Sequence, residues 1–377
     1  MSRILVLCYE YPPLGGGGGR VAAHVASALV AREHEVCFVT GGLPSLPSRS
    51  MIDGVRVIRV HARRRRADTC SILEMCCWVM ASLPVVLGEA FSWKPHVIHA
   101  HFAVPTGVVA WIVHKLTRIP YVLTVHLGDV PGGVPEQTDH LFKILKPFTI
   151  PIWRSAAYVT AVSSFVADLA SKAYNIQPKI ILNGIPALLH PHQSFSHAPR
   201  LLMVGRLSIQ KNPILAIQAL ALVRELSWTL QIVGEGPLLL ESKDCVKRLG
   251  LEDKISFLGW LSVCEVRKTM EESDILLIPS LSEGLPMVGV EALTHGLAIV
   301  GSRIGGLRDI INEDQNGVFF NLDHGAVAMA QALRPLLENA LLRTQMKNAS
   351  LHKAKNFHWS SSIDAYESIL EATKRDH

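Results

Sequence analysis

The sequence predicts an α/β protein in which two doubly wound parallel sheets form separate domains. Short apolar, β-branched runs alternate with longer helical segments along most of the 377 residues, and strand–helix–strand repetition is typical of parallel sheets. This length exceeds the ~100 to 200 residues of an ordinary domain, which favours two domains. A polar segment at 190–199 separates two sets of strands and is the expected linker.

The first domain is expected to span residues 1–189. Its apolar runs predict seven strands, at Ile4–Leu7, Val36–Thr40, Val55–Val60, Val97–Ala100, Tyr121–Val125, Tyr158–Val162 and Ile180–Leu182.

The second domain is expected to span residues 200–356 and to have a sheet of the same type. The runs predict six strands, at Leu201–Val204, Leu230–Val233, Ile255–Phe257, Ile275–Ile278, Ala298–Val300 and Val318–Phe320. Residues 357–377 are expected to form a closing helix that packs back towards the first domain. Apolar residues recur there at helical spacing, at Ile363, Tyr366, Ile369 and Leu370.

Composition favours a globular chain in a reducing compartment. Hydrophobic residues make up 49% and charged residues 18%, which excludes disordered and fibrous classes. The seven cysteines show no spacing of a zinc or redox motif, so free thiols and a cytoplasmic chain are expected. The apolar run after Met1 is too short for a signal peptide. The longest apolar stretch, Ile72 to Phe91, contains two glutamates and a proline, and a buried helix is expected there rather than a membrane span.

Five consecutive glycines follow the first predicted strand. Gly15 to Gly19 precede a helical segment that is expected to begin at Val21. Glycines let backbone N–H groups approach an anion at a helix N-terminus, so this segment either contacts a phosphate or forms a flexible turn. Dinucleotide binding of the GxGxxG type fits poorly, because the second strand ends in Gly41-Gly42 rather than in an acidic residue.

Two cations follow the first strand of the second domain. Arg206 comes at the carboxyl end of that strand, where ligands bind in open α/β sheets, and Lys211 lies just before a helix that begins near Pro213. A guanidinium grips two phosphate oxygens and an ammonium adds a point charge, so the pair suits a diphosphate leaving group. The alternative is a solvated loop with incidental charge.

A second loop carries two carboxylates. Glu283-Gly284-Leu285-Pro286 follows the strand Ile275–Ile278, with Pro286 expected at the first position of a helix that contains Glu291. Carboxylates at these places can accept hydrogen bonds from sugar and ribose hydroxyls, while the Gly284 and Leu285 N–H groups face phosphate or sugar. The alternative for one of them is a surface helix cap without a ligand.

These segments together resemble the donor-site motifs of glycosyltransferase family 4, retaining enzymes of the GT-B fold. The resemblance covers nearly the whole chain. It rests on the glycine loop and on the segments Gly205-Arg206-x4-Lys211, Val233-Gly234-Glu235-Gly236-Pro237, Glu283-x7-Glu291, Gly301-Ser302-Arg303-Ile304-Gly305-Gly306 and Asn316-Gly317. It implies two Rossmann-like domains that face a cleft, with a nucleotide-diphosphate sugar as co-substrate and with no other cofactor and no metal.

The resemblance also implies roles for individual residues. Arg206 and Lys211 would hold the diphosphate, Glu283 the hydroxyls of the transferred sugar and Glu291 the ribose. The backbone from Glu235 through Gly236 to Pro237 would lie near the base. Gly16, Gly17 and Gly18 would approach donor phosphate or acceptor. His126, just after the strand Tyr121–Val125, matches a family histidine that lies against the donor sugar, whereas His99 and His101 are expected to be structural.

The expected activity is hexosyl transfer to a glycan, lipid-linked or small-molecule acceptor, in cell-surface polysaccharide or glycolipid synthesis. The alternatives are a GT-B epimerase or phosphorylase, a non-catalytic partner subunit, and, less well supported, a nicotinamide dehydrogenase. This sequence departs from the family at Ile185-Pro186, Leu285-Pro286 and Arg308, which leaves the choice of sugar open. No nucleic-acid partner is expected.

The basic segment Arg63 to Arg66 introduces a membrane hypothesis. Lys and Arg exceed Asp and Glu by 18 to 11 up to Ile185, and anionic lipid attracts such residues by ~1 kcal/mol each near its surface. The segment is therefore either a contact for the inner face of a membrane or a solvated loop.

Overall fold

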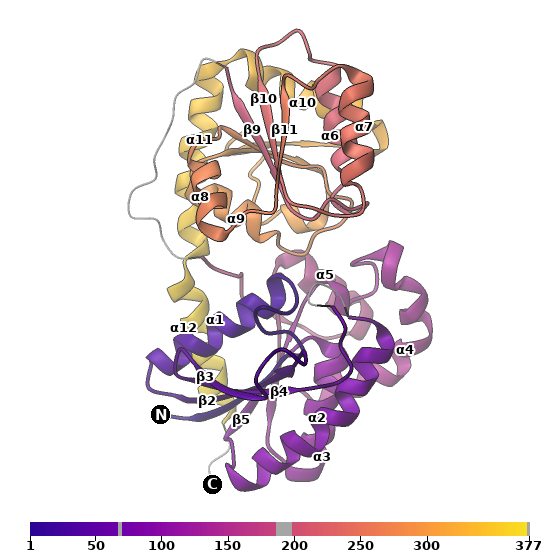
Figure 1. Cartoon of the computed structure of the whole chain (residues 1–377). Helices are drawn as coiled ribbons and strands as arrows, with labels where there is room; N and C mark the ends of the chain where they lie inside the picture. The colour runs from indigo at the N-terminus through magenta and orange to yellow at the C-terminus, as the bar shows by residue number, and fades with distance from the viewer. Residues whose placement is uncertain (67–69, 186–197, 375–377) are drawn as a thin grey trace. The chain divides into compact units, whose positions relative to one another are not determined.

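The computed structural model describes residues 1–66, 70–185 and 198–374. The chain forms two compact units, one made of Met1–Asn183 with the segment that starts at Ser360, and the other of Gly184–Trp359 (Figure 1). Most of the expected linker, residues 190–197, lies outside the described residues.

The first unit is built on an eight-stranded sheet of order β3-β4-β2-β1-β5-β6-β7-β8. Helices α1 and α12 lie on one side of it, and α2 and α3 on the other (Figure 1). The elements are β1 (Arg3–Leu7), α1 (Gly17–Ala31), β2 (Glu35–Gly41), β3 (Arg49–Ile52), β4 (Val55–Val60), α2 (Ile72–Ser92), β5 (Val97–His101), α3 (Val108–Thr117), β6 (Tyr121–Val125), α4 (Pro135–Ser155), β7 (Tyr158–Ala161), α5 (Ser164–Tyr174), β8 (Lys179–Ile180) and α12 (Trp359–Thr373).

The doubly wound parallel sheet expected in the first domain is confirmed, with one antiparallel strand added at its edge. Strand β3 was not predicted, and it pairs antiparallel with β4. Its residues alternate between exposed and half-buried, so they lack the continuous apolar run of a buried strand. Asp53 and Gly54 connect the two strands with φ of 48° and 76°, and Asp-Gly is a strong signal for a two-residue hairpin.

Helix α2 is not the buried helix that the sequence suggested. Its buried residues are Trp78, Ser82, Val86 and Ala90, and only 17% of its most apolar 18-residue window is buried. Among the residues that the structure describes, it is the one helix long and apolar enough to cross a membrane by length and composition, which by itself is weak evidence for a span. The error arises because an apolar run does not reveal whether a neighbouring element covers each of its faces.

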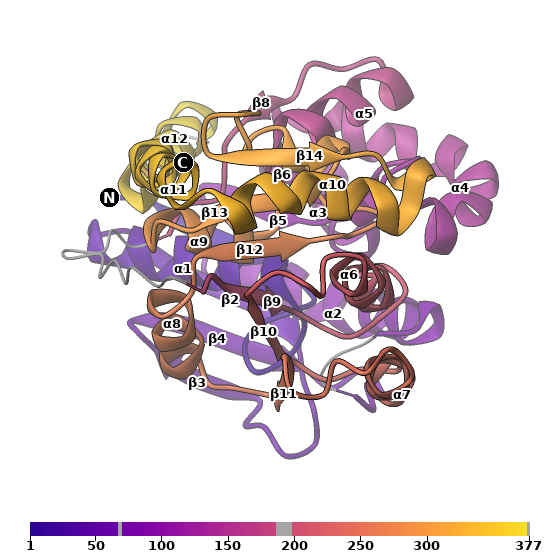
Figure 2. The ribbon, with the colours of Figure 1, turned by 90° about the horizontal axis from the view of Figure 1, so that it is seen from above.

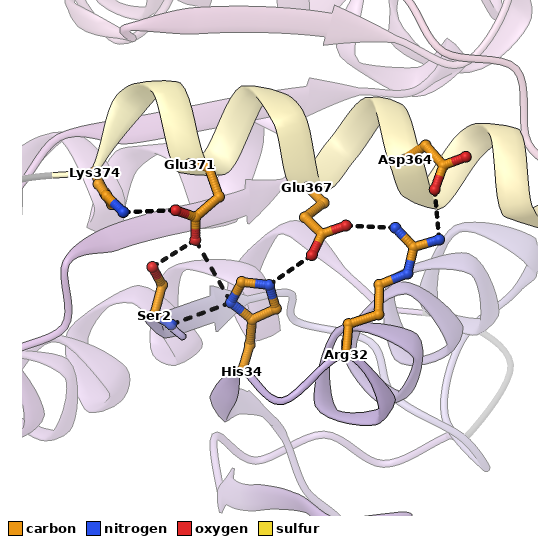
Figure 3. A network of polar contacts seen from close by, with 7 residues as sticks. All are labelled: Ser2, Arg32, His34, Asp364, Glu367, Glu371 and Lys374. Atoms are coloured by element: carbon orange, nitrogen blue, oxygen red, sulfur yellow. Dashed lines mark hydrogen bonds and ion pairs between the residues drawn. The ribbon is translucent and has the colours of Figure 1, made fainter.

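Helix α12 brings the end of the chain onto the first unit. Tyr366, Ile369 and Leu370 are at most 2% exposed, and burial of such side chains stabilises by about 1.5 to 3 kcal/mol each. A polar network runs beside this contact (Figure 3): Glu367 receives hydrogen bonds from Arg32 at 2.5 Å and from His34 at 2.9 Å. The Ser2 hydroxyl donates to Glu371 at 2.6 Å.

The second unit has a six-stranded parallel sheet of order β11-β10-β9-β12-β13-β14. Helices α6, α7 and α10 lie on one side of it, and α8, α9 and α11 on the other (Figure 2). The elements are β9 (Arg200–Val204), α6 (Pro213–Ala221), β10 (Thr229–Val233), α7 (Leu239–Leu249), β11 (Ile255–Gly259), α8 (Val263–Glu271), β12 (Ile275–Ile278), α9 (Met287–Thr294), β13 (Ala298–Ser302), β14 (Gly317–Phe320), α10 (Gly325–Glu338) and α11 (Ala340–Ala354).

Candidate active site

The loops that carry the predicted donor residues gather at one place in the second sheet. Strand β9 has β10 on one side and β12 on the other, so the order of strands reverses between β9 and β12. Ligands of open α/β sheets bind outside the carboxyl ends of the strands at such a switch point. Lys211 follows β9 and Glu283 follows β12, so both lie where this rule places a ligand.

Lys211 and Glu283 form an ion pair. The Lys211 Nζ lies 2.5 Å from the Glu283 Oε1, with side-chain exposures of 23% and 9%. The hydroxyl of Ser280, also after β12, donates to the same oxygen at 2.6 Å. Gln210 also joins the two loops. Its side-chain amide donates to the Ser282 carbonyl at 2.9 Å, and its backbone carbonyl accepts from the Leu281 N–H at 2.8 Å. An ion pair and two hydrogen bonds therefore join two loops whose residues Lys211 and Glu283 are 72 positions apart.

Glycines allow the neighbouring loops to approach this junction. A Cβ at Gly306, which lies in a 3-10 turn after β13, would overlap the backbone carbonyl of Glu283. A Cβ at Gly236 would overlap the Leu207 carbonyl in the loop after β9. Backbone atoms cannot rotate away as a side chain can, so these two glycines set the spacing of the site.

The other predicted donor residues lie on the same loops, at more exposed positions. Arg206 is exposed directly after β9, and Glu235 and Pro237 are exposed after β10. The Glu235 carbonyl accepts from the Leu207 N–H at 2.9 Å, which holds the loop of Glu235, Gly236 and Pro237 against that of Arg206. Glu291 lies half-buried in α9.

The segment before α9 differs from the expectation by one residue. Pro286 is the N-cap in an extended conformation, with ψ of 111°, and the helix begins at Met287. Its carbonyl accepts from the Gly289 and Val290 N–H groups, as an N-cap carbonyl does. Leu285 is 7% exposed and Gly284 is half-buried.

In the first unit the glycine loop follows β1 at the equivalent switch point, because β1 lies between β2 and β5. Helix α1 begins at Gly17 rather than at Val21, so Gly17 and Gly18 belong to its first turn and Gly16 is the N-cap. The Gly16 N–H donates to the Glu10 carboxylate at 3.0 Å. One amide that was expected to meet an anion therefore meets a carboxylate of the chain itself.

His126 lies at the end of β6 and is 8% exposed. Burial lowers the pKa of its imidazole to about 4, so the ring is neutral near pH 7. The Asp129 N–H donates to the His126 backbone carbonyl at 3.0 Å, and the Nε2 of the ring is buried without a partner among the described residues. The ring stacks on Phe102 with centroids 4.3 Å apart, and a Cβ at Gly18 would contact both rings. Gly18 and His126 are thus brought together.

Four residues at these two places were not predicted from the sequence: Glu10, Phe102, Asp129 and Ser280. Ser280 follows the predicted strand Ile275–Ile278 by two residues and Asp129 follows His126 by three, spacings that a search for caps and turn residues could have found. No signal points to Phe102, because only the tertiary structure stacks it on His126.

His99 and His101 are fully buried in β5. Burial lowers the pKa of His99 to about 3 and that of His101 well below its usual value. The His99 Nε2 lies 2.8 Å from the Thr124 hydroxyl. Within residues 1–66, 70–185 and 198–374, no three His, Cys, Asp or Glu side chains form a group that could hold a metal ion.

Two known domain families match the chain. The family "Glycosyl transferase 4-like domain" matches residues 16–184 and "Glycosyl transferases group 1" matches residues 187–353. Among relatives, the chain is 28% identical over 410 residues to a glycogen synthase of Mycobacterium tuberculosis, covering 99% of this chain and 95% of that protein. It is 23% identical over 383 residues to the N-acetyl-alpha-D-glucosaminyl L-malate synthase of Bacillus anthracis, covering 99% and 98%.

Solved structures share the fold at lower identity. A sucrose-phosphate synthase from Thermosynechococcus elongatus superposes with a TM-score of 0.81 at 18% identity, covering 99% of this chain and all of that one. Anabaena HepE, in complex with UDP and glucose, superposes with a TM-score of 0.77 at 18% identity and the same coverage. The two family matches and the shared two-sheet architecture show that this chain belongs to the GT-B glycosyltransferase superfamily.

Proposed function

We propose that this glycosyltransferase is a retaining, metal-independent enzyme that moves a hexose-type sugar from a nucleotide-diphosphate sugar to a glycan, lipid-linked or small-molecule acceptor. The observation that carries the proposal is the Lys211–Glu283 pair at the switch point of the second sheet. The names of the relatives, which include a glycogen synthase and a glucosaminyl L-malate synthase, support sugar transfer. The complexes of HepE with UDP and with UDP-glucose support a uridine nucleotide.

An exchange of ion-pair partners explains why a lysine and a glutamate share one site. Before the donor binds, Glu283 neutralises Lys211 across 2.5 Å. A diphosphate carries more negative charge than one carboxylate, so it draws the ammonium group towards itself. The Glu283 oxygen is then free to accept a hydrogen bond from a sugar hydroxyl while Ser280 keeps the carboxylate in place.

The other residues predicted from the sequence complete this scheme. Arg206 and Lys211 stabilise the charge that develops on the departing diphosphate. Glu291 binds the ribose, and the loop of Glu235, Gly236 and Pro237 lies near the base. His126 lies against the donor sugar, and Gly16 to Gly18 approach donor phosphate or acceptor. Retention follows from attack on the face that the diphosphate leaves, with a donor phosphate oxygen accepting the acceptor's proton.

A thermal-shift screen of the whole chain against UDP, GDP and ADP and their glucose conjugates tests donor binding. A ligand that binds only the folded state raises the melting temperature by mass action. We expect one nucleotide series to stabilise the wild type and to lose that effect in Arg206→Ala. Arg248→Ala, on an exposed position of α7, is the control for the loss of charge. Equal shifts in both variants, or no shift with any nucleotide, would contradict the proposal.

Two further assays test the type of reaction and its independence of metal. Consumption of the donor only when an acceptor is added would separate transfer from epimerisation and phosphorolysis. Full activity in excess EDTA is expected, because two cations supply the charge that a metal would otherwise supply, and loss of activity there would refute metal independence.

Peripheral binding to an anionic membrane is the second part of the proposal, and the surface of α2 supports it. The exposed residues Leu73, Cys76, Met80, Pro84 and Phe91 follow one another at helical spacing, and none is charged. Leu73, Met80 and Phe91 are 74%, 75% and 65% exposed. An apolar face flanked by basic residues is typical of helices that lie in a membrane surface.

The basic segment before α2 is more limited than the sequence suggested. Arg63 and Arg65 are exposed, but Arg64 is 6% exposed and donates to the carbonyls of Tyr9 and Arg66. Arg64 is therefore a structural residue, which leaves its neighbours to meet lipid phosphates. Flotation with vesicles of phosphatidylcholine alone or with phosphatidylglycerol tests this binding.

Met80→Glu should abolish flotation with the anionic vesicles, and Arg65→Glu should weaken it. Leu240→Glu, at a position 75% exposed in the second unit, is the matched control. Wild-type flotation of Met80→Glu would exclude α2 as the contact surface.

A further inference from the structure

We propose that Asp129 is a positioning residue that fixes the orientation of His126 and holds Phe102 against it. This inference rests on the proposed function, since it concerns the residue expected to lie beside the donor sugar. The Asp129 side chain is 5% exposed. Its carboxylate accepts backbone N–H groups from two different loops, which lie at the carboxyl ends of β5 and β6.

The first tie is local. The His126 N–H donates to the Asp129 Oδ2 at 2.8 Å. The Asp129 N–H donates to the His126 backbone carbonyl at 3.0 Å, so a reciprocal pair of bonds closes the turn from His126 to Asp129. Burial keeps the imidazole neutral near pH 7, and its Nε2 is buried without a partner among the described residues. The closed turn fixes the backbone from which the ring extends, and with it the direction of that nitrogen.

The second tie crosses to the loop after β5. The Ala103 N–H donates to the Asp129 Oδ1 at 2.8 Å, and the Val104 N–H beside it also lowers the pKa of the carboxyl. Phe102, immediately before them, has φ of 73°, a conformation that a bulky residue rarely adopts and that the surroundings must hold in place. In this conformation its ring stacks on His126 and lies edge-on to Tyr9.

Asp129 is costly to bury, which argues against an incidental role. The hydrogen-bond partners found for its carboxylate are backbone N–H groups. Burial raises the pKa of its carboxyl to about 7 although these three groups lower it. Burying a carboxylate costs more free energy than closing one turn would justify. Here the carboxylate joins two loops around one histidine ring, and this explains its burial.

The test uses the full chain and isothermal titration with UDP and with UDP-glucose. Asp129→Asn keeps the shape of the side chain, but its amide nitrogen cannot accept one of the backbone N–H groups. We expect the ratio of the Kd for UDP-glucose to the Kd for UDP to rise about five- to tenfold, the size of one lost hydrogen bond, with the Kd for UDP unchanged. A residue that only stabilises the fold would not change this ratio.

A double-mutant comparison shows whether Asp129 acts through His126. His126→Ala should raise the same ratio, and Asp129→Asn added to it should have no further effect, because residues that act as a unit are not additive. Val86→Ala, at a fully buried position of α2, is the control for general loss of stability. Multiplying effects, or an unchanged ratio in Asp129→Asn, would overturn the inference.

Ring proton spectra of histidine-labelled protein provide a measurement that needs no donor. The His126 ring signals, assigned by their loss in His126→Gln, should be displaced in the wild type by the ring current of Phe102, whose ring centroid lies 4.3 Å away. Phe102→Leu gives the reference without this ring, and in Asp129→Asn the signals should move towards that reference or broaden. Equal signals in the wild type and in Phe102→Leu would refute the inference even if Asp129→Asn does not fold. If the wild type binds neither UDP nor UDP-glucose but shows the displaced signals, the proposed donor fails and the positioning role stands.

Discussion

Replacing Glu283 by glutamine separates the binding of the nucleotide from the transfer of the sugar. The amide has nearly the same shape, so Ser280 can still donate to its oxygen, but the contact with Lys211 loses its charge. Hydrogen bonds to charged groups are worth about twice as much as neutral ones, so we expect the free energy of unfolding of the second unit to fall by about 1 to 2 kcal/mol. The melting temperature should fall by roughly 2 to 8 °C.

The same substitution has opposite expected effects on affinity and rate. Without the carboxylate, Lys211 meets the diphosphate with no competing anion. Two unit charges 4 Å apart in water interact by about 1 kcal/mol, so the Kd for UDP should stay unchanged or fall by up to ~5-fold. Turnover should fall on the order of 100-fold, as when one preorganised polar group is removed from a transition state.

Titration with UDP and measurement of product formation with an added acceptor give the two numbers. Glu252→Gln, an exposed residue in the loop between α7 and β11, is the control that makes the same change of charge in the same unit. Wild-type turnover in Glu283→Gln would refute the role of this carboxylate. A Kd for UDP weakened more than tenfold would refute the exchange of ion-pair partners.

Three further outcomes can be measured. Gly306→Ala should lower the free energy of unfolding by about 1 to 3 kcal/mol and reduce turnover, because the added Cβ overlaps the Glu283 carbonyl. Gly88→Ala is the control: its Cβ meets no neighbour within 4 Å in α2, so stability should change by less than ~1 kcal/mol. Equal melting temperatures of the two variants would contradict this prediction. Burial raises the pKa of Asp129 to about 7, above the unfolded value of ~4. The stability that proton binding to Asp129 contributes is therefore full below pH ~4 and is lost as the pH rises through 7. Denaturant titrations should show that the free energy of unfolding falls over this range in the wild type more than in Asp129→Asn, and parallel pH curves of the two would refute the expectation. Glu367→Gln should lower the free energy of unfolding by about 1 kcal/mol and increase hydrogen exchange in α12, because it weakens the contacts with Arg32 and His34. Unchanged exchange would show that apolar packing alone holds this helix.

The sequence by itself determined the two α/β sheets and the residues that follow their strands. A parallel strand buried on both faces needs a continuous apolar run, and helices must separate such strands. The bounds of two strands, Ile275–Ile278 and Tyr121–Val125, were therefore predicted to the residue. The charged residues Arg206, Lys211 and Glu283 could also be predicted as ligand-binding residues, since the loops after parallel strands bind the ligands of these sheets.

Only the tertiary structure decided which groups meet. Strand order is a long-range property, and it alone brings Lys211 to 2.5 Å from Glu283 and stacks Phe102 on His126. Burial is decided in the same way: α2 and a buried helix have similar composition, but no described element covers the face of Leu73 and Met80. Local patterns specify what each segment can do, whereas packing between distant segments specifies its partner, because the free energy of those contacts exists only once the chain has folded.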